Sequence, residues 1–90
     1  MPKVFFTPAL KKFFPGIEPQ RINSLVLADA VNELDAIYPG LKNYLLEDDG
    51  AMRKHVNIFI TNELAKDRKT LSDPIAENDE MYILQALSGG

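Results

Sequence analysis

Residues 27–38, with the sequence LADAVNELDAIY, decide the fold of this chain of 90 residues. Apolar side chains recur along them at helical spacing and form one stripe, which consists of Leu27, Ala30, Val31, Leu34, Ile37 and Tyr38. Acidic residues lie mostly off this stripe, and Pro39-Gly40 follows it as a stop signal. The spacing predicts one amphipathic helix over residues 27–38, which buries Leu34 and Ile37 against the rest of the protein.

Strands are predicted on both sides of this helix. The clearest is residues 55–61, where Val56, Ile58 and Ile60 alternate with His55, Asn57, Phe59 and Thr61. The other predicted strands are residues 4–6, a weak strand at 21–25, a short strand near Leu64, and residues 80–85. Residues 41–46 are expected to add a short helical turn. This order favours an α+β fold, in which a mixed sheet of about five strands carries one main helix across one face, and the β-grasp roll fits it best.

Composition excludes several classes of function. Ten Lys and Arg residues against thirteen Asp and Glu residues give a net charge of −3, so the global basic surface of a nucleic-acid-binding protein is absent. There is no cysteine and only one histidine, His55, which argues against disulfides, thiolate metal sites and multi-histidine metal sites. No apolar run approaches the roughly 20 residues of a membrane span, and the N-terminus does not have the pattern of a signal peptide. We therefore expect one cytoplasmic domain over residues 1–90, with no bound metal or cofactor and no membrane contact.

A candidate partner surface follows from the alternation of the strands. If Val56, Ile58 and Ile60 face the helix, Phe59 points off the opposite face of the sheet. By the same argument Phe5 and Leu84 join Phe59 on that face. Single exposed apolar residues are common and carry no function, but three of them on one face form a patch, and exposed patches often bind partners.

The end of the chain is the second candidate site. Ser88-Gly89-Gly90 follows closely on the last predicted strand, and residues 86–90 are expected to form a flexible Gly-Gly tail. Glycine has no Cβ, so such a tail can lie extended in a narrow tunnel of another enzyme. Small residues are also common at frayed termini, and a functionless tail is the alternative. No nucleophile or base lies close in sequence, so any chemistry here has the Gly90 carboxylate as its substrate.

Four motifs together resemble the MoaD/ThiS family of sulfur carriers, which are ubiquitin-like β-grasp proteins. They are Tyr38-Pro39-Gly40-Leu41 after the helix, residues 55–60 (HVNIFI), residues 77–80 (ENDE), and residues 83–90 (ILQALSGG). The resemblance covers nearly the whole chain, with the motifs in the family's order.

The resemblance implies a mechanism in which this protein is a carrier and not an enzyme by itself. A ubiquitin-activating-like enzyme uses ATP to adenylate the Gly90 carboxylate, and a sulfur donor then converts it to a thiocarboxylate. Gly89 and Ser88 thread this end into a sulfur-acceptor enzyme, either the large subunit of molybdopterin synthase or a cysteine synthase. In the former case the chain is the small subunit of that synthase. Phe5, Phe59, Leu84 and Leu87 are expected to contact these partners.

The pathway and the fate of Gly90 stay open at the level of sequence. Molybdopterin-synthase small subunits usually have a shorter segment between the helix and the third strand than residues 41–54 here. The run at residues 54–58 (KHVNI) looks more like carriers that serve cysteine synthesis. Gln85-Ala86 and Pro15-Gly16 depart from the usual family pattern, although neither touches the terminal glycines. Two other functions remain: a ubiquitin-like protein modifier joined to target lysines through Gly90, and a non-catalytic interaction domain whose tail is idle.

Overall fold

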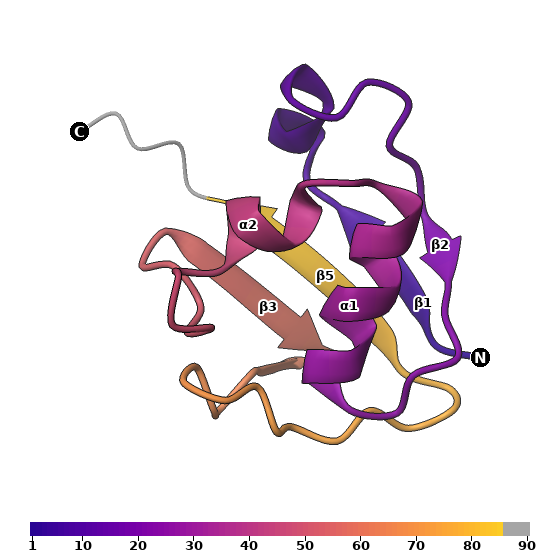
Figure 1. The fold of residues 1–90 in the computed structure, drawn as a ribbon. Coiled ribbons are helices and arrows are strands. Elements are labelled where there is room, and N and C mark those ends of the chain that lie inside the picture. The colour runs from indigo at the N-terminus through magenta and orange to yellow at the C-terminus, as the bar shows by residue number, and fades with distance from the viewer. Residues whose placement is uncertain (86–90) are drawn as a thin grey trace.

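The computed structural model describes residues 1–85 and shows a five-stranded mixed sheet with one long helix across one face (Figure 1). In chain order the elements are β1 (Lys3–Phe6), the 3-10 helix η1 (Pro8–Lys12), β2 (Gln20–Arg21), α1 (Leu27–Ile37), α2 (Leu41–Leu45), β3 (Val56–Ile60), β4 (Glu63–Leu64) and β5 (Glu80–Gln85). The strands lie in the order β2-β1-β5-β3-β4, and only the central β1–β5 pair is parallel. The predicted β-grasp fold is thus confirmed.

Helix α1 packs its apolar stripe against the sheet. Leu27, Ala30, Val31 and Leu34 are buried, as the periodicity predicts. The prediction for Ile37 is wrong, because its side chain is 43% exposed. Ile37 is the last residue of the helix, and the chain turns away directly after it. Tyr38 packs against the core in its place, with its ring edge-on to Phe6 at 5.9 Å between centroids.

Strand β2 is shorter and earlier than the predicted strand at residues 21–25. Its pairing with β1 covers only Gln20 and Arg21. The chain then leaves the sheet, because the backbone N–H groups of Asn23 and Ser24 donate to the carboxylate of Glu33 on α1, at 3.0 and 3.1 Å. The Ser24 hydroxyl donates to the same carboxylate at 2.7 Å. This contact across ten residues ties the loop to the helix and ends the strand.

The core lies between α1 and the inner face of the sheet. The inner face contributes fully buried side chains from three strands: Val4, Ile58, Met81 and Ile83. Helix α2 closes one end of this core with Leu41 and Leu45, which are also fully buried. Among the described residues, α1 and α2 lie on one face of the sheet and no helix covers the opposite face (Figure 1). This outer face carries the candidate site.

Candidate functional site

Apolar side chains from four adjacent strands gather on the outer face of the sheet. We call this group the outer-face patch, and it consists of Phe5, Phe59, Leu64, Tyr82 and Leu84. The strand register sets them side by side, since Tyr82 lies between Phe5 and Phe59, and Phe59 lies opposite Leu64. Leu64, Tyr82 and Leu84 are exposed, at 46%, 39% and 39%. So large an exposed apolar group on so small a protein is the usual mark of an interaction surface.

Aromatic stacking gives the outer-face patch a fixed shape. The rings of Phe5 and Tyr82 stack with centroids 4.9 Å apart and planes 12° apart. The Lys3 ammonium lies 5.3 Å above the Phe5 ring, where the ring quadrupole attracts a cation. A shallow cavity of about 290 Å³ opens beside these rings, lined by Phe59, Thr61, Asn62, Tyr82 and Leu84. The outer-face patch therefore combines a shallow, mainly apolar hollow with a cation at its margin.

The structure places three of the predicted partner-binding residues together. Phe5, Phe59 and Leu84 all belong to the outer-face patch, and their role in binding stays a prediction. The sequence reasoning did not select Tyr82 or Leu64. Tyr82 could have been found from its even spacing with Leu84, whereas Leu64 requires the β3–β4 register. Leu87, Ser88, Gly89 and Gly90 lie outside the described residues.

Strand β5 connects the outer-face patch to the end of the chain. Its inner residues Met81 and Ile83 are fully buried, while Tyr82 and Leu84 point outward. Gln85, its last residue, lies opposite Val56 at the beginning of β3. The five residues that follow Gln85 therefore continue from a strand that is anchored on both sides, by β1 and by β3.

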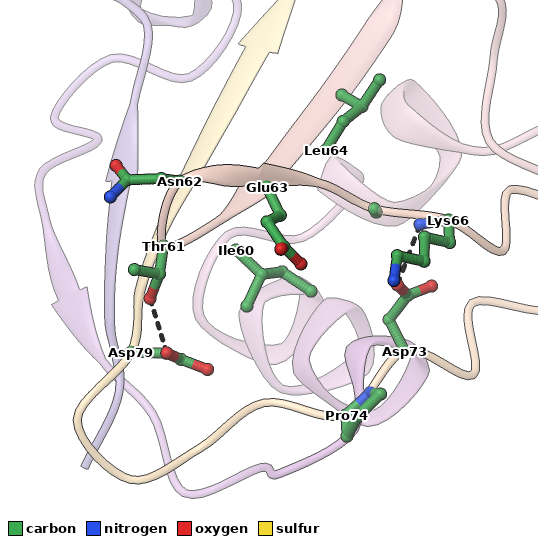
Figure 2. Close-up of a pocket in the computed structure, with 10 residues that line it drawn as sticks. Ile60, Thr61, Asn62, Glu63, Leu64, Lys66, Asp73, Pro74 and Asp79 are labelled. Atoms are coloured by element: carbon green, nitrogen blue, oxygen red, sulfur yellow. Dashed lines mark hydrogen bonds between the residues drawn. The ribbon is translucent and has the colours of Figure 1, made fainter.

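A second hollow lies at the other end of β5, and none of the predicted site residues lines it. This cleft of about 480 Å³ lies between the turn from β3 to β4 and the loop before β5, with Glu63 pointing into the space between Asp73 and Asp79 (Figure 2). The Thr61 hydroxyl donates to Asp79 at 2.5 Å and the Ala76 N–H donates at 2.7 Å, and these bonds lower the pKa of Asp79.

The carboxylates of Asp73 and Asp79 are already used to hold the chain. Asp73 accepts the backbone N–H groups of Lys66 and Asp67, both at 2.8 Å. Asp79 fixes Thr61, a β-branched residue whose φ of +51° is unusual for an L side chain. Acceptors that are occupied in this way are poorly suited to proton transfer. Asp73 and Asp79 in this cleft therefore have a structural role, which is to hold the β3–β4 turn and the loop beside it.

Residues 1–85 contain no helix of the length and apolarity that crossing a membrane requires. In the same part of the chain, no three His, Asp or Glu side chains come together as metal ligands. His55 is exposed in the turn before β3, away from any carboxylate partner among the described residues.

Comparison with known proteins links this geometry to a family. No family model matches the chain. The sulfur carrier protein CysO of Mycobacterium tuberculosis is 30% identical over 66 residues, which is 71% of each protein. Small archaeal modifier protein 1 of Haloferax volcanii is 30% identical over 64 residues, 71% of this chain and 69% of that protein.

Solved structures of these relatives share the fold. Mycobacterium tuberculosis CysO superimposes with a TM-score of 0.82 at 24% identity, covering 97% of this chain and 100% of that one. The Haloferax volcanii modifier gives a TM-score of 0.80 at 24% identity, covering 99% and 98%. A chain of the Amycolatopsis orientalis BexX/CysO complex gives 0.83 at 16% identity, with full coverage of both. On the strength of the sequence relatives, the chain belongs to the MoaD/ThiS-type family of ubiquitin-like β-grasp proteins, which includes sulfur carriers and small archaeal modifiers.

Proposed function

We propose that this protein is a cytoplasmic sulfur carrier whose Gly90 carboxylate is adenylated and then converted to a thiocarboxylate. The observation that carries the proposal is the position of β5, which joins the outer-face patch to the end of the chain. One strand contributes Tyr82 and Leu84 to the outer-face patch and leads, through Gln85, into the Ser88-Gly89-Gly90 sequence. A partner enzyme that docks on the patch thereby receives the end of the chain. Family membership supports the same function.

The proposed chemistry needs little from the carrier beyond its carboxylate. A Gly90 carboxylate oxygen attacks the α-phosphorus of ATP in a ubiquitin-activating-like enzyme, and pyrophosphate leaves. Hydrosulfide sulfur then attacks the acyl carbon, AMP leaves as the bond to its phosphate oxygen breaks, and the thiol proton passes to solvent. The product is a thiocarboxylate whose sulfur is nucleophilic. Because the chain has no cysteine, this sulfur has no competing thiol on the carrier.

The acceptor in this proposal is a cysteine synthase or the large subunit of molybdopterin synthase. The 41–54 segment favours the former, since it contains the additional helix α2 and the turn at residues 47–50 before β3. The relative named CysO is a sulfur carrier, which is consistent with this choice. The carrier itself binds no cofactor in this scheme, and ATP belongs to the activating enzyme.

Intact mass spectrometry tests the proposal. The full chain is incubated with MgATP, sodium sulfide and the ubiquitin-activating-like enzyme of its source organism. Replacement of one terminal oxygen by sulfur adds roughly 16 Da, and the gain should require both ATP and sulfide. A chain that lacks Gly90 is the control. An unchanged mass in the complete mixture, with an enzyme that is active on another carrier, would refute the proposal.

A protein modifier is the second candidate, because one relative is named a small archaeal modifier protein. Both functions begin with the same adenylate, but in the modifier a target lysine amine displaces AMP and forms an isopeptide bond. Immunoblots of cell extract under reducing conditions separate the two. A ladder of larger species that disappears when Gly90 is deleted would favour the modifier, and a single band at the carrier's own mass favours the carrier.

A further inference from the structure

The edge of β3 that faces away from β5 is only partly covered by another strand. Strand β4 pairs with Phe59 and Ile60 alone, and the Ala65 N–H then donates to the Ile58 carbonyl at 2.8 Å. Val56 lies two residues earlier, so its carbonyl is directed to this same edge. No strand of residues 1–85 reaches Val56 there, although a carbonyl at a sheet edge needs a donor.

The side chain of Arg68 takes the place of the missing strand. Its Nη2 donates to the carbonyls of Val56 and Arg53, at 2.9 and 2.6 Å, and Nη1 donates to Asn57 Oδ1 at 3.4 Å. Hydrogen bonds from a guanidinium are stronger than those between neutral groups, and the planar fork suits several acceptors at once. Arg68 thus binds three acceptors where the chain enters β3.

The loop around Arg68 holds the residue in position. The Arg68 carbonyl accepts the Met52 N–H at 2.7 Å. On one side of it Asp67 accepts the N–H groups of Lys69, Thr70 and Ser72, at 3.0 to 3.2 Å. Asp73 in turn accepts the Asp67 N–H at 2.8 Å. A side chain on a backbone fixed in this way loses less freedom when it forms its hydrogen bonds.

Two of the three residues that Arg68 binds lie opposite the end of β5. Val56 lies opposite Gln85, and Asn57 lies opposite Leu84. The N–H of Val56 donates to Arg53 and its carbonyl accepts from Arg68, so both groups face away from β5 and Val56–Gln85 is a non-hydrogen-bonded pair. By the alternation of an antiparallel ladder, Asn57–Leu84 is the hydrogen-bonded pair nearest the end of β5. Arg68 steadies this last hydrogen-bonded rung, because it binds the Asn57 side chain and the carbonyl of the residue before it.

We infer that Arg68 is a positioning residue for the activation of the Gly90 carboxylate, an inference that rests on the proposed carrier function. With Arg68 in place, the chain leaves the sheet at Gln85, at a fixed distance from the outer-face patch. Without it the last hydrogen-bonded rung frays, and each freed residue lengthens the unanchored chain before the carboxylate by about 3.3 Å. The freed residues must then be ordered again in the partner's tunnel, which slows the chemical step.

The test compares Arg68→Met with Lys69→Met, a matched control that removes a charge from the same loop, where the Lys69 ammonium forms no ion pair among the described residues. Full chains are incubated with the activating enzyme, MgATP and sodium sulfide, and thiocarboxylate formation is followed by mass spectrometry. For Arg68→Met we expect kcat to fall about 10-fold while KM changes much less, because Phe5, Phe59 and Tyr82 of the outer-face patch keep their places. Arg68→Lys should recover part of the rate. Amide exchange of Asn57 and Leu84 should accelerate in Arg68→Met but not in Lys69→Met.

The other possible results contradict either the positioning role of Arg68 or the proposed function. If Arg68→Met keeps the wild-type kcat, or raises KM with kcat unchanged, the positioning role is wrong while the proposed function stands. If the wild type forms no thiocarboxylate, the proposed function fails and the inference fails with it. If Arg68→Met does not fold, Arg68→Lys carries the comparison, and a wild-type kcat together with faster exchange at Leu84 then overturns the inference.

Discussion

Leu34 and Ile37 stand three residues apart on α1, yet only Leu34 is fully buried. Replacing Leu34 by Ala should lower the free energy of unfolding by about 2–5 kcal/mol, because it leaves a cavity in the core of a small domain. Ile37→Ala removes a side chain that is 43% exposed, and we expect a change of about 0.5 kcal/mol. Urea denaturation of both variants measures the difference. Equal losses would show that the stripe is buried along its whole length.

Asp67 couples the loop of residues 66–73 to pH. The Ser72 hydroxyl, followed by the hydroxyl and N–H of Thr70, donates to its carboxylate and holds its pKa far below the ordinary value. The folded state therefore binds fewer protons than the unfolded state, so this contribution to stability is complete above the ordinary carboxyl pKa. It is lost as the pH falls from about 5 toward 2.

The expected outcome is a smaller acid sensitivity in Asp67→Asn than in the wild type. The urea midpoint of the wild type should fall more between pH 7 and pH 3 than that of the variant, which has no proton to gain at this position. Asp48→Asn, on the exposed turn at residues 47–50, is the control and should retain the wild-type pH dependence. Identical slopes in wild type and Asp67→Asn would show that other carboxylates dominate acid unfolding.

At the scale of elements, the two faces of β5 differ in burial, so substitutions on them should separate an effect on stability from an effect on the proposed binding. Ile83 is fully buried and Leu84 is 39% exposed. Ile83→Ala should therefore cost about 2–5 kcal/mol of stability. Leu84→Ser should change stability little but raise the KM for the activating enzyme, since it removes an apolar contact from the outer-face patch. Denaturation and steady-state kinetics on the pair check both statements. A Leu84→Ser chain that reacts with the wild-type KM would remove Leu84 from the docking surface.

Periodicity explains which elements could be predicted from the sequence. Helix α1 and strands β3 and β5 each bury one face, so their apolar residues recur with the period of the structure. Strand β2 has no such signal, because its end is set by the bonds from Asn23 and Ser24 to Glu33, ten residues away from Asn23. The same holds for Ile37, whose exposure depends on where the chain turns after the helix.

The residues of the candidate site also fall into two groups, those that a local sequence pattern predicts and those that it does not. Alternation within single strands was enough to select Phe5, Phe59 and Leu84. Leu64 needed the register between two strands, and Arg68 needed a side chain to replace a strand partner. A local pattern does not record either of these, because both depend on contacts between residues that are distant in sequence.

At the scale of the whole molecule, the proposed function assigns folding and chemistry to separate parts. Gly90 and Gly89 lie beyond Gln85, the last residue of β5. Deleting Gly90 should leave the urea midpoint unchanged, yet it shifts the reacting carboxylate by about 3.3 Å. Placement errors near 1 Å can cost about 10²-fold in rate, so adenylation and thiocarboxylation should be lost.

Gly89→Val should have a similar effect, because a branched side chain restricts the backbone conformations of the tail and adds bulk within the tunnel of the partner enzyme. Ser88→Ala, a small change one residue earlier, should keep most of the activity. A chain without Gly90 that still supports its pathway fully would mean that the terminal carboxylate is idle, and the protein would then act only as an interaction domain.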